Sequence, residues 1–302
     1  MKRKIINILF SITLLLLTIL IFINQDITTN YFLDCFYFLI KVIIPSIFPF
    51  MIFVNFILFS NCIDYLAILL SPIGKIFKLS GYGTICVIAS LLGGYPYSAI
   101  IVSSFIKNQK ISTHEGNRII NSCFFPSLSF LFVGLLNIDY KFIYIIISLY
   151  ISSFIILFIS SLKTIPNDNY TNEIHINNDL SNIYNEVMNS SIKSIINICF
   201  TVLFFNLLTS TLTLFINNER IIYYISGILE FSNSSINILL LDNKTYIDYL
   251  ILMIVISFSS LSIIMQSMFY LKQINIKIKQ LLISRLIIVL LSVIIFTLLY
   301  FI

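Results

Sequence analysis

Charged residues are scarce in this sequence. Lysine, arginine, aspartate and glutamate together make up 10% of the 302 residues, whereas a soluble domain carries about 25%. Hydrophobic residues make up 59%, and the mean hydropathy is +1.01. So few charges cannot cover a water-facing surface, which excludes a soluble globular protein. The net charge of +5 is thinly spread and includes no basic tract, so we expect no nucleic-acid partner.

The sequence also lacks the patterns of catalytic and metal-binding proteins. Its five cysteines are widely spaced without a C-x-x-C pair, and its two histidines, His114 and His175, lie in polar connections without a partner motif. No Walker loop, H-E-x-x-H, G-x-S-x-G or nucleotide-binding fingerprint occurs, so nothing indicates an ATP-driven pump. We therefore expect no enzymatic activity, no metal and no cofactor, and we interpret the cysteines as small apolar residues within helices.

What the sequence does contain is long apolar runs. They extend to about 20 residues, the length of helix that crosses a bilayer, and they are continuous, which favours helices over strands. We predict an all-α polytopic membrane protein, embedded in the lipid bilayer, with roughly seven to nine membrane segments. The N-terminal "MKRK" and the apolar run after it are followed by no cleavage site, which predicts an uncleaved signal anchor with its N-terminus inside.

A polar, asparagine-rich stretch divides the chain into two halves. We assign residues 1–30 to the signal-anchor span, 31–163 to the first half, 164–189 to a linker and 190–302 to the second half. The halves look related, because "IKVIIPSIFPFMIF" at 40–53 aligns without gaps with "IKSIINICFTVLFF" at 192–205. Internal repeats with broken hydrophobic segments are typical of transporters. We therefore expect two similar halves with discontinuous helices or re-entrant hairpins.

The positive charges predict the topology of these halves. The basic connections 107–118 and 272–285 are expected on the side of the N-terminus, with the stretch 163–186 on the other side. Each half then starts and finishes on the same side, which makes the repeats parallel. In this interpretation "SLLGGYPYSAI" lies opposite "SFSSLSIIMQ" in the repeat.

The first half has two breaks in its apolar segments. Irregular backbone at membrane depth is tolerated only where it is buried or lines a wet cavity, and a half-helix N-terminus exposes N–H groups that suit an anion. The alternative to a solute-binding break at "GGYPYS" is a proline kink with close helix packing. The alternative at "NSCFFPS" is an ordinary loop. The predicted solute-binding residues of this half are Gly93, Gly94, Tyr95, Pro96, Ser98, Asn121, Ser122, Pro126 and Ser127.

The second half carries an acid inside an apolar segment. Ionisable groups at membrane depth are costly and usually face a pathway, so Glu230 is a candidate carrier of a coupling proton unless its segment is an interfacial loop. The serines of "SFSSLSIIMQ" either bond back to their own helix or face the solute. The predicted solute-binding residues of this half are Glu230, Ser232, Asn233, Ser259, Ser260, Ser262 and Gln266.

These motifs, in this order, resemble the YlbJ family of sporulation integral membrane proteins, which carry the nucleoside-recognition or Gate domain. The resemblance covers the chain from Cys35 to its end. It rests on "IIPSIFPF" (43–50), "LLGGYP" (91–96), "KNQKIS" (107–112), the segment 121–126, "GILE" (227–230) and "SFSSLSIIMQ" (257–266). The chain departs from the family pattern where glycines are expected, at Phe125, Ser234 or Ser235, Ser259 and Ser260.

The resemblance implies a transporter of a small anionic metabolite, with dipicolinic acid, an aromatic dianion, as the expected substrate. It implies uptake across the outer forespore membrane, from the mother-cell side, during sporulation. Half-helix N-termini, serine and asparagine donors and tyrosine rings suit dipicolinate, and they suit a nucleoside, the alternative substrate, as well. A further alternative is a non-transporting scaffold of the sporulation envelope. The sequence indicates no oligomeric state.

Overall fold

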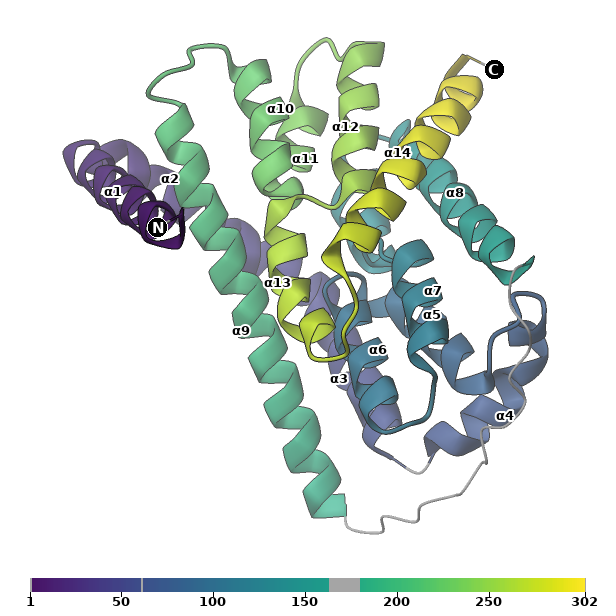
Figure 1. Ribbon diagram of the computed structural model, residues 1–302. Coiled ribbons are helices and arrows are strands. Elements are labelled where there is room, and N and C mark those ends of the chain that lie inside the picture. Colours follow the sequence, from purple (N-terminus) through teal and green to yellow (C-terminus); the bar gives the residue numbers. More distant parts are fainter. Residues whose placement is uncertain (1, 61, 163–179, 302) are drawn as a thin grey trace.

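The computed structural model describes residues 2–60, 62–162 and 180–301, and within these ranges the chain is helical and contains no strand (Figure 1). This confirms the predicted all-α class. The elements are α1 (Lys2–Ile23), α2 (Gln25–Phe38), the π-helix η1 (Leu39–Ile43), α3 (Ile44–Phe59), α4 (Cys62–Lys75), α5 (Gly81–Gly93), α6 (Tyr97–Lys107), α7 (Thr113–Ser122), the π-helix η2 (Phe130–Leu136), α8 (Phe142–Leu162), α9 (Leu180–Leu212), α10 (Glu219–Leu229), α11 (Phe231–Leu240), α12 (Tyr246–Phe258), α13 (Leu261–Lys272) and α14 (Ile278–Phe301).

Five of these helical segments are long and apolar enough to cross a membrane, which makes the chain an α-helical integral membrane protein. They are Gln25–Phe59, Phe142–Leu162, Leu180–Leu212, Tyr246–Lys272 and Ile278–Phe301. The shorter apolar helices α5 and α6 do not reach that length, because about 20 residues are needed to cross the hydrocarbon core.

The two ends of the bundle are defined by contacts between distant loops. At one end, Lys107 after α6 donates to the side-chain oxygen of Gln273 after α13. At the other end, the Tyr249 hydroxyl of α12 donates to Asp139, between η2 and α8, across 2.5 Å. We call the first the basic end and the second the opposite end.

A helical hairpin enters the bundle from the basic end. Helices α5 and α6 pack antiparallel, with the Tyr82 ring 6.0 Å from the Phe105 ring near the base and the tip at residues 93–96. The next crossing is broken: α7 rises from the basic end, the chain loses helical form at 123–127, and η2 completes the crossing. Helix α8 then returns to the basic end (Figure 1), where Arg118 of α7 donates to Ser160 near its C-terminus.

A second hairpin enters from the opposite end. Helices α10 and α11 pack antiparallel, because the Ser234 hydroxyl donates to the Tyr223 carbonyl across 2.5 Å, and their tip is Glu230. The crossing that follows is also broken, between α12 and α13 at Ser259 and Ser260, and α14 returns alongside it (Figure 1). Each half therefore contains a hairpin, a broken crossing and a return helix.

The two halves enter from opposite ends, so the prediction of parallel repeats is wrong. Three passes through the bundle, the broken α7–η2, α8 and α9, separate the hairpins, and an odd number of passes inverts the second unit. Of the three, α8 and α9 are long and apolar enough to span a membrane. The predicted register is wrong for the same reason: the Gly93–Pro96 tip corresponds to Glu230, and the 123–127 break corresponds to Ser259 and Ser260. Inverted repeats with broken helices are a recurrent architecture of secondary transporters.

Two predicted boundaries also differ from the structure. Helix α2 begins at Gln25 and continues through η1 into α3, so the boundary at 30/31 falls inside a helix. Asp26 and Asp34 lie within helix α2 and not in a loop, because the residues of α2 include no glycine or proline that would end a helix. Helix α9 begins at Leu180, so 180–189 is helix and not linker, while 164–179 lies outside the described residues. The N-terminal end of α9, which holds residues 180–186 of the stretch predicted on the other side, lies at the basic end (Figure 1).

A carboxylate fixes the base of each hairpin. At the basic end, Asp64 of α4 accepts hydrogen bonds of 2.7 Å from the Tyr82 hydroxyl and the Lys110 ammonium. At the opposite end, Asp248 of α12 accepts a 2.5 Å bond from Tyr224 of α10 and lies 3.6 Å from a guanidinium nitrogen of Arg220. Both hairpins are thus anchored at the base while their tips meet inside the bundle.

Candidate solute site at the helix breaks

The tip of the first hairpin is built on close contact between backbones. Gly94 has φ +67° and ψ −169°, a conformation open essentially to glycine alone. A Cβ at this position would lie 2.3 Å from the backbone nitrogen of Ser127. Beside it, the Tyr95 N–H donates to the Phe125 carbonyl across 2.9 Å. In this conformation the backbone of the broken crossing therefore fills the space beside Gly94.

The broken crossing of the first half is held by a buried arginine. Arg285, fully buried on α14, donates to the Asn121 carbonyl across 2.7 Å and to the Phe124 carbonyl. These carbonyls belong to the C-terminal end of α7, where helix ends leave acceptors unpaired and favour a positive charge. Its Nε atom has no hydrogen-bond partner in the described part of the chain. The sequence analysis places Arg285 in a basic connection, because a charged residue just before an apolar run is typical of a loop. In the structure Arg285 lies within α14.

Glu230 forms the tip of the second hairpin. The side chain is buried, and its two carboxylate oxygens accept the backbone N–H groups of Ser232 at 2.9 Å and Asn233 at 3.0 Å. The acid therefore caps the helix that it precedes, which places a negative charge at the positive end of α11. It forms no ion pair with any described residue. Glu230 is 2% exposed, so its carboxylate lies inside the bundle.

Asparagines tie both hairpin tips to the long helices beside them. On the first hairpin, the Tyr97 hydroxyl donates to Asn55 of α3 across 2.5 Å, and Asn55 donates to Ser191 of α9 across 2.8 Å. On the second, Asn233 donates to Asn206 of α9 across 2.9 Å. Both tips are thereby attached to α9, directly in the second half and through α3 in the first.

The last break separates α12 from α13. Ser259 and Ser260 have φ values of +73° and +27°, and the Ser260 and Ser262 hydroxyls lie 2.8 Å apart. The Ser259 hydroxyl and both amide atoms of Gln266 have no hydrogen-bond partner among the described residues. Since buried polar groups are nearly always paired, these groups mark a place where water or a solute is needed.

One pocket is lined by residues at three of the four breaks and by Ile263, three residues after the break at Ser259 and Ser260. It is lined by Ile43, Ile47, Tyr95, Pro96, Pro126, Ser127, Phe130, Ile198, Val202, Phe231, Ser232 and Ile263. The space inside admits a water-sized probe and nothing as large as a metabolite. The hairpin tips are therefore in close contact in this conformation.

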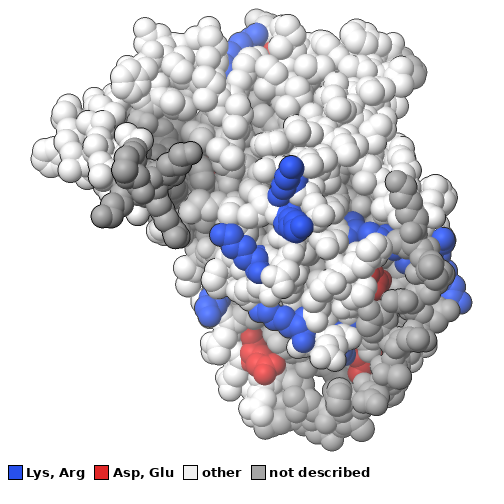
Figure 2. Space-filling model, viewed as in Figure 1, with Lys and Arg blue, Asp and Glu red and all other residues white. Residues whose placement is uncertain are grey.

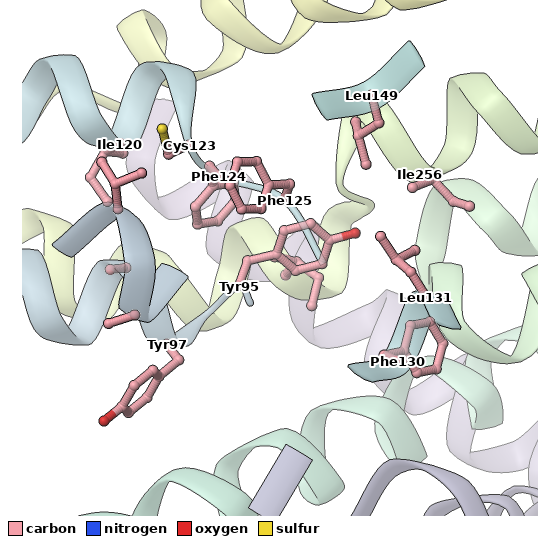
Figure 3. Packing of buried hydrophobic residues seen from close by; sticks show 14 of the residues in the cluster. Tyr95, Tyr97, Ile120, Cys123, Phe124, Phe125, Phe130, Leu131, Leu149 and Ile256 are labelled. Carbon is pink, nitrogen blue, oxygen red and sulfur yellow. The ribbon is translucent and has the colours of Figure 1, made fainter. Parts of the chain in front are cut away.

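Aromatic rings join the two tips across the pocket, and Figure 3 shows those of Tyr95, Phe124 and Phe130. The Tyr95 ring lies 5.3 Å from Phe124 and 5.2 Å from Phe231, and Phe130 lies 5.5 Å from Phe231. The Arg285 guanidinium lies over the Phe124 ring, 5.5 Å from its centroid. The Tyr95 hydroxyl has no hydrogen-bond partner among the described residues. Ring contacts, tilted at Phe124–Tyr95 and edge-to-face at Tyr95–Phe231, therefore connect Arg285 to the residue that follows Glu230.

The predicted site residues divide into two groups. Tyr95, Pro96, Pro126, Ser127 and Ser232 line the pocket. The others surround it at the breaks or on adjoining turns without lining it: Gly93, Gly94, Ser98, Asn121, Ser122, Glu230, Asn233, Ser259, Ser260, Ser262 and Gln266. Of these, the Ser122 hydroxyl bonds back to Arg118 of its own helix, and the Ser98 hydroxyl has no partner in the described part.

Sequence reasoning missed the apolar wall of the pocket. Ile43 and Ile47 come from the η1–α3 segment, Ile198 and Val202 come from α9, and Phe231 follows Glu230. In a sequence this rich in isoleucine and phenylalanine, no signal separates a pocket-lining side chain from a lipid-facing one. Among the described residues, no group of three histidine, cysteine or acidic side chains is placed to hold a metal ion.

Comparison with known proteins adds no relative. The chain matches no protein-family model, no curated protein and no solved structure.

Proposed function

We propose that this protein is a membrane transporter of a small anionic metabolite, and that dipicolinic acid is its substrate. One observation carries the proposal: two re-entrant hairpins and two broken segments, arranged as inverted repeats, surround one narrow pocket, and three of their four breaks line it. Broken helices at a repeat interface hold the substrate in many secondary transporters. A scaffold protein gains nothing from four helix breaks that converge inside a membrane.

The electrostatics of the pocket region support an anion. Four half-helices, α6, η2, α11 and α13, begin at the breaks, and their N-terminal N–H groups favour negative charge. Glu230 already occupies the N-terminus of α11, which leaves the other three. Arg285 adds a fully buried positive charge beside Phe124. The rings of Tyr95 and Phe231 suit a flat aromatic solute.

The choice of dipicolinate rests on the resemblance to the YlbJ family, and so does the proposed site of action at the outer forespore membrane. The second candidate substrate is a nucleoside. The apolar and aromatic lining of the pocket favours any flat ring, and its Ser127 and Ser232 side chains could serve a ribose as well as a carboxylate.

Uptake into vesicles separates these candidates. The full chain is reconstituted, and labelled dipicolinate and labelled uridine are offered in parallel, with protein-free vesicles as the control. We expect saturable uptake of dipicolinate that unlabelled dipicolinate suppresses and uridine does not. Uptake of uridine alone would replace our proposal with the nucleoside transporter, and uptake of neither under any imposed gradient would favour the scaffold.

A further inference from the structure

The outer surface of the basic end carries many lysines with few exposed acids. Figure 2 shows lysine and arginine side chains in a row across the face over α6, α9 and α13, whereas the region over α10–α12 is mostly white. The exposed lysines of this end are Lys75, Lys78, Lys107, Lys272, Lys277 and Lys279. Of its acids, Asp64 and Glu115 are buried, and Glu186 on the first turns of α9 is exposed.

Contacts between loops make this surface continuous. Lys110, in the α6–α7 connection, reaches Asp64 of α4 at 2.7 Å, and Lys107 donates to Gln273 in the α13–α14 connection. The lysines of α4, of the α6–α7 connection and of the α13–α14 connection therefore belong to one basic surface. Among the described acids of this surface, Asp64 is already paired with Lys110 and Tyr82.

Helix α4 adds an apolar face to the basic surface. Along one side of the helix Ala67 and Gly74 are buried against α5, while Leu69 on the other side is 70% exposed. The exposed large side chains are Tyr65, Ile68, Leu69, Ile73 and Ile76, which recur at helical spacing. In Figure 1 α4 runs crosswise to α9 at this end of the bundle. A crosswise amphipathic helix flanked by lysines is the form of an interfacial membrane helix.

We propose that the basic end binds anionic phospholipids, with α4 lying in the headgroup region and the lysines contacting lipid phosphates. Basic residues next to an apolar helix face attract the anionic lipids of the cytoplasmic leaflet, and an excess of lysine at one end also predicts that this end faces the cytoplasm. The partner is the lipid leaflet and not a soluble anion, because the apolar face of α4 needs acyl chains to cover it.

The test uses the absence of tryptophan from the sequence. Leu69→Trp places a single fluorophore on the exposed face of α4, and Phe215→Trp, at a residue 73% exposed between α9 and α10, places one at the opposite end. Each full-length variant is reconstituted in vesicles containing equal fractions of brominated phosphatidylglycerol or of brominated phosphatidylcholine. We expect the anionic lipid to quench the α4 tryptophan at least about twofold more strongly than the zwitterionic lipid, with no such preference at the opposite end.

The charge requirement is checked in the same assay. Replacing Lys75, Lys78 and Lys107 by glutamine should remove the preference of the Leu69→Trp protein, and raising the salt concentration should weaken it in the protein that keeps its lysines. The measurement at high salt uses the protein that keeps its lysines, so it remains informative even if the triple variant folds poorly. Equal quenching by the two lipids, or a preference that survives both high salt and the substitutions, would overturn the proposal.

Discussion

Gly94 and Ser127 meet backbone to backbone where the first hairpin reaches the broken crossing. A Cβ on Gly94 would lie 2.3 Å from the Ser127 nitrogen, and the Tyr95 N–H next to it bonds the Phe125 carbonyl at 2.9 Å. The glycine is needed for packing between two breaks. A substitution at Gly94 therefore disturbs the packing of the two breaks, whether or not a solute binds nearby.

Gly94→Ala should lower both stability and uptake. The backbone conformation of Gly94 costs a residue with a side chain about 1–3 kcal/mol, and the clash with Ser127 adds to that cost. We expect a thermal midpoint lower by several degrees in detergent and a loss of dipicolinate uptake. The control is Gly134→Ala, where the nearest contact is a Phe130 ring carbon at 3.2 Å. A normal midpoint with lost uptake would mean that Gly94 leaves space for the solute and is not needed for packing.

Glu230→Gln tests coupling to protons. A glutamine keeps one oxygen to accept from the α11 backbone but cannot exchange a proton, so the cap is partly retained. We expect accumulation against a gradient to be lost and exchange of internal for external solute to persist. Glu230→Ala, which removes the cap as well, should in addition destabilise the protein by about 1 kcal/mol. Full accumulation by the glutamine variant at every pH would show that Glu230 is only a helix cap.

Arg285→Lys should destabilise the broken crossing of the first half. A single ammonium cannot reproduce the fork by which the guanidinium reaches both the Asn121 and Phe124 carbonyls. We expect a loss of about 2–4 kcal/mol, measured as a lower unfolding midpoint. Arg220→Lys is the matched control, because Arg220 is partly exposed and lies 3.6 Å from Asp248; it should cost less than about 1 kcal/mol. If both substitutions lowered the free energy of unfolding equally, the buried contacts of Arg285 would contribute no more to stability than the partly exposed contacts of Arg220.

The topology is tested by labelling single cysteines with an impermeant thiol reagent. In a background without the five native cysteines, Asn108→Cys and Asn275→Cys should react from one side, and Asn243→Cys from the other. All three positions are exposed and lie in connections. Reaction of Asn243→Cys from the same side as Asn275→Cys would refute the inverted arrangement of the halves.

The contribution of Asp139 to the stability of the folded protein should be lost in acid. Burial alone would raise its pKa, but bonds from the Tyr249 hydroxyl, the Lys141 N–H and the Lys244 ammonium outweigh burial and hold the pKa below its ordinary value. The folded state therefore gains stability from the ionised group above about pH 4, and loses it as the pH falls through the lowered pKa. Asp139→Asn should lower the unfolding midpoint at pH 7 and change it little at pH 2. An equal effect at both values would mean that the charge contributes nothing.

The sequence by itself determined the class of this protein and the positions of its breaks. Continuous apolar runs with few charges can be stable only in a bilayer, and the Gly93–Pro96, 123–127, Glu230 and Ser259–Ser260 interruptions are visible because glycine, proline, serine and glutamate stand out among isoleucine and phenylalanine. Those local signals do not depend on what packs against them.

Only the tertiary structure decided how the breaks meet. The second hairpin enters from the end opposite to the first because three passes through the bundle lie between the two hairpins. These passes can be counted only when α5–α6 and α10–α11 are known to turn back inside the bundle. The roles of Gly94 and Arg285 depend on Ser127, Asn121 and Phe124, partners from other elements. Pocket residues such as Ile43 and Val202 are chemically identical to the lipid-facing residues around them, so their place was set by packing and not by residue type.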